Sequence, residues 1–113
     1  MTHRIFEMPV AEVYPHYVNK VRRKGSSEKV LHEVIRWLTG FNEAALKKQL
    51  ASGATFKQFF KAAKMNSKAK LITGSVCGVK VQEIEDPLMR KIRYLDKLVD
   101  ELAKGRPLEK VLR

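Results

Sequence analysis

The chain has 113 residues, 44% of them hydrophobic and 31% charged, and its 23 Lys and Arg against 12 Asp and Glu give a net charge of +11. This length fits a single domain, residues 1–113, and the apolar share is too high for a disordered chain. No apolar run approaches the roughly 18 residues of a membrane span, and the first residues, MTHRIFEMPV, lack the apolar region of a signal peptide. We therefore expect a cytoplasmic protein with no membrane partner.

Helix start and stop residues divide the first half of the chain. Pro15 lacks the N–H group that a continuous helix would use, so we expect a short turn near residues 9–13 and then a helix over residues 15–24. The next three helices are predicted from residues that cap helix N-termini, Ser27, Asn42 and Thr55. They cover residues 28–39, 43–51 and about 56–64.

The pattern changes after residue 70. β-branched residues between 71 and 81 favour a short β-hairpin that turns at residues 73–75, with an irregular loop as the alternative. Asp86 then caps a long helix that has Pro87 at its first position, the spacing of a core-facing helix, and an end at Gly105. A last short helix follows over residues 107–112. The sequence therefore predicts a mainly all-α domain of five to six helices.

Most of the excess positive charge lies in the middle of the chain. Residues 40–75 carry seven lysines against the single acid Glu43, a net charge of +6, compared with +3 for residues 1–39 and +2 for residues 76–113. On one continuous helix, a spacing of four, three and four residues would align four of them in a ridge: Lys57, Lys61, Lys64 and Lys68. A helix that ends at Lys64 would take Lys68 off this line. We interpret the ridge as a phosphate-binding face with Lys47, Lys48 and Lys70 as neighbours, and a solvated surface is the alternative.

Three further groups are candidates for contacts. Arg22 and Arg23 lie near a predicted helix C-terminus, where the helix dipole alone favours cations. Trp37 lies beside the apolar stripe of its helix, either as a boundary residue or as an anchor for a protein partner. In VYPHY the tyrosines share the packing side of the helix and we expect their hydroxyls to be hydrogen-bonded, whereas His16 points away and remains a candidate contact.

No pattern indicates an enzyme. Cys77 is the only cysteine and is flanked by apolar residues, which is typical of an inert buried thiol. The histidines show no HxH or HExxH spacing, and no phosphate-binding glycine loop is present. We therefore expect no catalytic residue, no metal and no cofactor. A pocket near His16, Tyr17 and Cys77 is the least supported alternative.

Four segments resemble the bacterial proteins grouped as domain of unknown function 2200: VYPHYVNK, RWLTGF, VCGVKV and EDPLMRKIRYLDKLVDELAKGRPLEKVLR. The likeness runs from His3 to the C-terminus. It implies a small, stand-alone, mainly α-helical protein of the orthogonal-bundle kind. The family has no assigned activity, so the resemblance supplies no functional residue, and the lysine spacing is not part of the family pattern.

Two hypotheses of function follow. The first is a non-enzymatic module that binds nucleic acid or another acidic partner through the lysine-rich face. The second is a protein-interaction module that forms a homo-oligomer, or docks a protein partner, through apolar surface around Trp37 and the long C-terminal helix.

Overall fold

The computed structural model describes residues 4–76 and 78–113, which form a mainly helical domain. The α-helices of this part of the chain are α1 (Val10–Arg22), α2 (Glu28–Thr39), α3 (Glu43–Ala51), α4 (Phe56–Ala62), α5 (Pro87–Ala103) and α6 (Leu108–Val111). The described residues also form a β-hairpin of β1 (Ser75–Val76) and β2 (Val79–Lys80). They include three 3-10 helices, η1 (Arg4–Glu7), η2 (Ser67–Leu71) and η3 (Val81–Glu83). The predicted fold class is confirmed. Within these ranges, no helix combines the length and the apolar character that crossing a bilayer requires.

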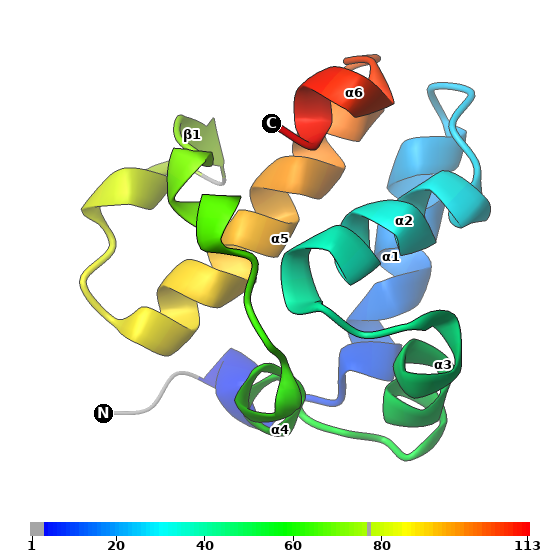
Figure 1. Cartoon of the computed structure of the whole chain (residues 1–113), viewed down its shortest axis with the longest axis vertical. Helices are drawn as coiled ribbons and strands as arrows, with labels where there is room; N and C mark the ends of the chain where they lie inside the picture. The colour runs from blue at the N-terminus through cyan, green and yellow to red at the C-terminus, as the bar shows by residue number, and fades with distance from the viewer. Residues whose placement is uncertain (1–3, 77) are drawn as a thin grey trace.

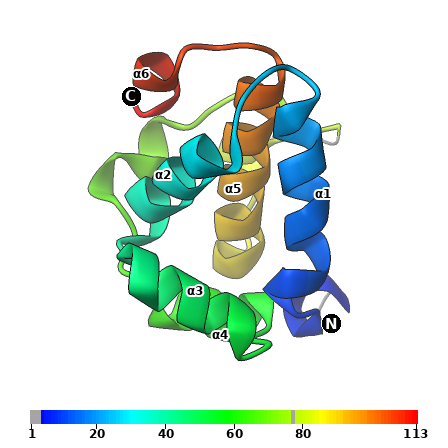
Figure 2. The same ribbon diagram turned by 90° about the vertical axis from the view of Figure 1, so that its right-hand side faces the viewer.

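Helix α5 runs through the middle of the molecule (Figure 1). It contacts α1, α2, α4, α6 and β1, and in Figure 2 it lies between α1 and α2. The Asp86 side chain accepts a hydrogen bond from the Met89 N–H at 2.9 Å, so the helix begins where its capping residue predicts. Its apolar stripe is buried: Ile92, Leu95, Leu98, Val99 and Leu102. Burial of each such side chain contributes about 1.5–3 kcal/mol.

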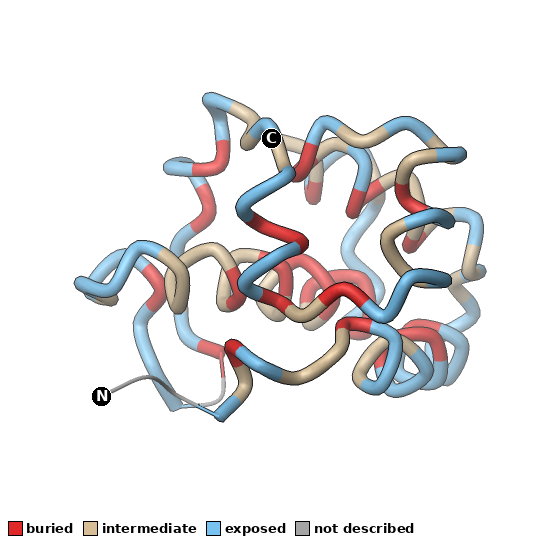
Figure 3. The backbone as a smooth tube through the Cα atoms, turned by 90° about the horizontal axis from the view of Figure 1, so that it is seen from below, coloured by how far each residue is buried: buried red, intermediate tan, exposed pale blue. Residues whose placement is uncertain are grey.

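The other helices turn their apolar sides toward α5. Figure 3 shows the buried positions recurring along the inner side of the backbone, with exposed positions on the outside. Helix α4 contributes Phe56, Phe59 and Phe60 to the core. The rings of Phe59 and Phe60 meet edge to face with 5.1 Å between centroids, the arrangement that aromatic quadrupoles favour. A capping box between Thr55 and Gln58 fixes the start of this short helix.

The predicted start of the first helix is wrong, because α1 begins at Val10 and continues through Pro15. Tertiary contacts fix the beginning of this helix. The Val10 N–H donates to the Ala54 carbonyl at 2.9 Å, the Phe56 N–H donates to the Met8 carbonyl at 3.0 Å, and Val10 itself is buried. Pro15 and Ala11 both lie on the exposed side, so the Ala11 carbonyl, which has lost its helical partner, is open to solvent. Contacts with residues over 40 positions away thus outweigh the local cost of about 3 kcal/mol.

The packing side of α1 is the predicted one. Tyr17, Val18 and Val21 are buried, and His16 is exposed. The expected hydrogen bond of a tyrosine hydroxyl is also present, because the Tyr17 O–H donates to Asp96 Oδ1 at 2.7 Å.

The predicted end of the fourth helix is also wrong, because α4 ends at Ala62 and Ala63 is extended. After Ala62 the backbone donates hydrogen bonds to the last carbonyl groups of α2. The Lys64 N–H donates to the Thr39 carbonyl at 2.8 Å and the Asn66 N–H donates to the Leu38 carbonyl at 3.0 Å. These carbonyls have no partner within their own helix, so the hydrogen bonds replace water at a buried helix end.

The β-hairpin is present, but its turn lies later than predicted. Ser75 pairs with Lys80 and Val76 with Val79, so Gly74 precedes the hairpin. The Gly74 backbone has φ 107°, a conformation that glycine adopts without strain. Its N–H donates to Gln82 Oε1 at 3.1 Å. The glycine therefore marks a bend into the hairpin.

A buried ion pair joins the end of α5 to the chain after α6. Glu101 is 5% exposed, and both of its carboxylate oxygens accept hydrogen bonds from Arg113, each at 2.7 Å. Arg106 Nη1 lies 3.2 Å from Glu101 Oε2. Removing one member of such a pair leaves an uncompensated buried charge.

We expect Glu101→Ala to lower the free energy of unfolding by about 3 kcal/mol in urea denaturation, because Arg113 then loses its buried partner. Glu109→Ala is the control, since Glu109 is exposed and forms no ion pair with a described residue. Its effect should stay within about 0.5 kcal/mol. Equal losses in the two variants would contradict a stabilising role for the Glu101 pair.

Candidate nucleic-acid interface

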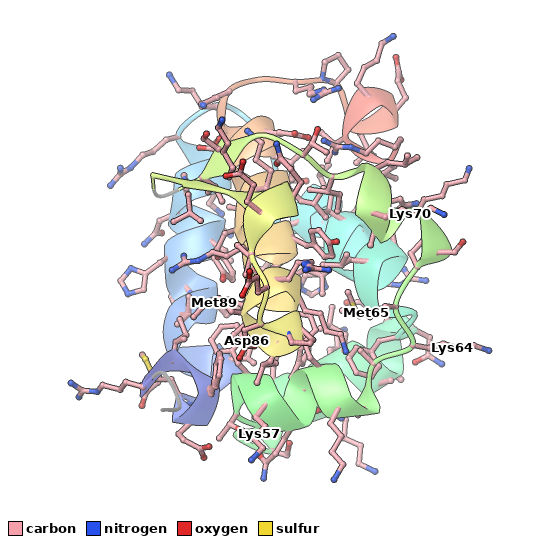
Figure 4. The ribbon with its side chains drawn as sticks, turned by 90° about the vertical axis from the view of Figure 1, so that its left-hand side faces the viewer. Lys57, Lys64, Met65, Lys70, Asp86 and Met89 are labelled. Carbon is pink, nitrogen blue, oxygen red and sulfur yellow. The ribbon has the colours of Figure 1, made fainter. Side chains whose placement is uncertain are left out.

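Seven lysines form what we call the lysine surface: Lys47, Lys48, Lys57, Lys61, Lys64, Lys68 and Lys70. All are exposed, and none forms an ion pair with a described residue. Helices α3 and α4 carry the first four and lie at the same end of the molecule (Figures 1 and 2). The other three follow along the segment that leaves α4. In Figure 4, Lys57, Lys64 and Lys70 point outward along this path.

The single straight ridge of four lysines is not present. Lys57 and Lys61 lie one turn apart on α4, but that helix ends at Ala62. Lys64 lies in the extended segment that caps α2, and Lys68 lies in η2. The lysine surface therefore curves around the molecule instead of following one helix face. Of the acids near it, Glu43 contacts His32 and Arg36 and also lies close enough to Lys47 for that charge to lower its pKa.

The structure separates the remaining predicted contacts from this surface. Arg22 ends α1 and Arg23 is its C-cap, at the opposite end of that helix from α3 and α4 (Figure 2). His16 lines a small pocket of about 180 Å³ with Tyr17 and Val76. Cys77, the third residue of that alternative, lies outside the described residues.

A hydrogen-bonded chain links the first three α-helices. His32 of α2 contacts the Tyr14 hydroxyl of α1 through Nε2, and Glu43 Oε1 of α3 through Nδ1 at 2.5 Å. A carboxylate only accepts, so Nδ1 carries a proton, and in the neutral ring the Tyr14 O–H donates to Nε2. Sequence reasoning missed this chain. The one signal was the spacing of Glu28, His32 and Arg36, which places three polar groups on one side of α2.

The chain shifts the proton affinity of both of its ends. Burial of the hydroxyl, together with the carboxylates of Glu28 and Glu43, raises the pKa of Tyr14 above its usual value of 10.0. The hydrogen bond from His32 is the main cause that lowers the pKa of Glu43, helped by the charges of His32, Lys47 and Arg36. At neutral pH the tyrosine is therefore protonated and Glu43 is ionised.

Two adjoining hollows lie along the outer side of α2, and we call them together the α2 groove. The first, of about 480 Å³, is lined by Glu28, Lys29, His32, Glu33, Arg36, Glu43 and Lys47. The second, of about 350 Å³, is lined by Glu33, Arg36, Trp37, Phe41 and Leu112. Trp37 is half-buried, as its place beside the apolar stripe predicts. Lys47 belongs to both the groove and the lysine surface, so the two are continuous.

The remaining candidate features are weaker. In the described part of the chain, no three His, Cys, Asp or Glu side chains cluster in a way that could hold a metal ion. The large apolar side chains that are exposed there, Leu71 and Val79, stand on separate elements. The apolar stripe of α5 is buried, so the interaction hypothesis retains only the surface beside Trp37.

The sequence matches a known protein family, and the fold matches a known structure. Residues 4–113 match the model of a family described as an uncharacterized protein conserved in bacteria, DUF2200. The chain belongs to this family. A crystal structure of the uncharacterized protein SP1917 has the same fold, with a TM-score of 0.91 and 42% identity over 99% of this chain and 93% of that one. No curated protein matches the chain. The family thus confirms the resemblance and assigns no activity.

We expect the protein to be less stable at alkaline pH, because the pKa of Tyr14 is raised in the folded state. The folded state holds the phenolic proton more tightly, so its contribution is complete below the usual pKa of 10.0 and is lost as the pH rises above that value. Urea denaturation at about pH 8 and about pH 11 measures the loss. In Tyr14→Phe the loss should be smaller than in the wild type, and Tyr94→Phe controls for removal of a tyrosine. If Tyr14→Phe loses as much stability between the two pH values as the wild type does, Tyr14 is not the group responsible.

Proposed function

We propose that this protein binds nucleic acid through the lysine surface. The observation that carries the proposal is the set of seven exposed lysines, none of which has an ion-pair partner among the described residues. Lysines arranged along a curved path attract a polyanion, and the release of counterions from the phosphates adds to the affinity.

The placement of the acidic residues explains why the excess charge remains at this surface. Asp100 lies 3.1–3.7 Å from Lys104, Lys20 and Lys97. Glu101 holds Arg106 and Arg113 in the same way. These carboxylates of α5 therefore compensate cations that surround α5, and the lysines of α3, α4 and η2 are not among them. Residues 40–75, which carry these lysines, account for +6 of the net charge of +11.

The chemistry of the surface fits the sugar–phosphate backbone. Lysine is a flexible point charge, suited to phosphates and not to a fixed pattern of base edges. Binding by such a surface is independent of sequence and depends steeply on salt. An acidic protein partner would meet the same charges, and the experiment below separates it from nucleic acid.

We expect the triple variant Lys47→Glu, Lys57→Glu, Lys61→Glu to lose binding to labelled DNA or RNA of about 20 nucleotides. The control triple variant Lys24→Glu, Lys80→Glu, Lys110→Glu makes the same change of net charge at exposed lysines outside the lysine surface. Fluorescence anisotropy at about 50 to 200 mM salt measures the affinity. The wild-type slope of log affinity against log salt should correspond to several phosphates, at about 0.7–0.9 per phosphate, and should fall in the first variant only.

Three outcomes would contradict the proposal. One is the absence of binding in the wild type at about 150 mM salt. Another is an equal loss in both triple variants, which would indicate a response to net charge alone. The third is lysine-dependent binding of an acidic protein with no binding of nucleic acid, which would assign the surface to the other class of partner.

A further inference from the structure

We propose that the part of the α2 groove beside Trp37 receives an unpaired base of a single-stranded nucleic acid, whose phosphates lie on the lysine surface. This inference rests on the proposed function and adds the type of strand. It would make the protein prefer single strands to duplexes.

The flat side chains lie at the C-terminal end of α2 and just beyond it, since Phe41 follows the C-cap Gly40. Trp37 and Phe41 supply aromatic rings, and Arg36 supplies a planar guanidinium group that is 44% exposed. Aromatic rings and guanidinium planes stack on nucleobases of any sequence, because every base has a π-face. The hollow of about 350 Å³ between them is large enough for a flat heterocycle and too small for a folded partner.

These side chains are held in place before any ligand arrives. The Trp37 side chain packs partly buried against the hydrophobic core, and its backbone carbonyl accepts a hydrogen bond from Asn66 Nδ2 at 3.1 Å. The Phe41 ring meets Phe59 of the core edge to face, with 5.1 Å between centroids. Arg36 Nη1 lies 3.9 Å from Glu43 Oε2, whose other oxygen is bound to His32. A prepared site of this kind avoids the entropy that ordering the side chains would cost on binding.

The carboxylates of the groove decide which part of a nucleotide enters it. Glu33 lines both hollows and forms no ion pair with a described residue, and Glu28 lines the first. Glu33 disfavours a phosphate in the second hollow, where Arg36 lies beside Glu43, whereas the first hollow also contains Lys29 and Lys47. We therefore expect the phosphates on the lysines and the base beside Trp37. A carboxylate also accepts hydrogen bonds from the amino groups of bases, as glutamate does with cytosine N4. Glu33 therefore favours bases that carry an amino group over thymine and uracil.

The continuity with the lysine surface gives the strand its path. Lys47 lines the first hollow and is also a member of the lysine surface. A strand held by the lysines of α3 thus passes the mouth of the groove. In a duplex the bases are paired and stacked inside, so only an unpaired base can turn into the hollow.

Trp37 is the only tryptophan of the chain, so its fluorescence reports on this hollow alone. We would titrate the protein with oligonucleotides of about 12 residues, namely dC, dA and dT homopolymers and a duplex of the same length. Stacking is expected to quench the fluorescence with dC and dA strands, less with dT, and not with the duplex. In anisotropy measurements, Trp37→Leu should weaken binding of the dC strand about tenfold and leave the duplex affinity unchanged. Glu33→Gln should reduce the preference of dC over dT.

The outcomes separate this inference from the proposed function. Lysine-dependent binding with equal affinity for single strand and duplex, and without quenching, would overturn the inference and leave the proposed function standing. Absence of all binding would overturn both. Quenching of the wild type requires no variant, so the test holds even if Trp37→Leu fails to fold, and Trp37→Phe keeps an aromatic ring in the same place. Equal losses for strand and duplex in the folded Trp37 variants would also overturn the inference.

Discussion

The burial of α5 is the constraint on which the rest of the structure depends. Its apolar stripe must be covered on several sides, and α1, α2, α4, α6 and β1 supply that cover. Because the helix is central, several of its acidic residues are largely buried, and their carboxylates form ion pairs with neighbouring basic side chains. Asp96 binds Arg93, Asp100 lies among three lysines, and Glu101 holds two arginines. Packing around α5 therefore decides which cations its carboxylates compensate. The lysines of α3, α4 and η2, elements that carry few acids, are among the cations that it does not compensate.

One local requirement connects the two parts of the candidate interface. The last carbonyls of α2 need donors, and the chain after α4 supplies them through the Lys64 and Asn66 backbone. This contact ends α4 early, bends the line of lysines around the molecule, and ties the Trp37 backbone to Asn66. Gly40 fits the same junction. Its φ is 75°, and a Cβ there would lie 2.7 Å from the Lys64 carbonyl oxygen, so a side chain would force the two segments apart. Contacts at this junction thus place both the segment that carries Lys64, Lys68 and Lys70 and the backbone at Trp37.

The parts of the fold that the sequence predicts correctly are those that local chemistry controls. The N-caps Ser27, Asn42 and Asp86 begin α2, α3 and α5 where expected. The errors at Pro15 and at the end of α4 arise where hydrogen bonds from distant segments decide the backbone. At the hairpin, the pairing of Ser75 with Lys80 places the turn later than the positions of the β-branched residues suggest. The same division holds for the candidate site. The lysine excess is visible in the composition, but its curved shape is not. The chain from Tyr14 through His32 to Glu43 joins residues 18 and 11 positions apart on three helices, and no spacing rule connects them.

The mixture of charges in the α2 groove is consistent with a ligand that has two chemically different parts. Glu43 is compensated, because His32 lowers its pKa and Arg36 lies beside it. Glu28 and Glu33 form no ion pair with a described residue, although Lys29 and Lys47 line the same first hollow, and an anion entering beside Trp37 would meet Glu33 directly. A polyphosphate alone is therefore a poor occupant, although the lysines outside attract it. A nucleotide strand meets both conditions, since its charge lies on the backbone and its bases are neutral and flat. The lysines then supply attraction without selectivity, and the carboxylates supply selectivity by excluding the charged part of the same ligand.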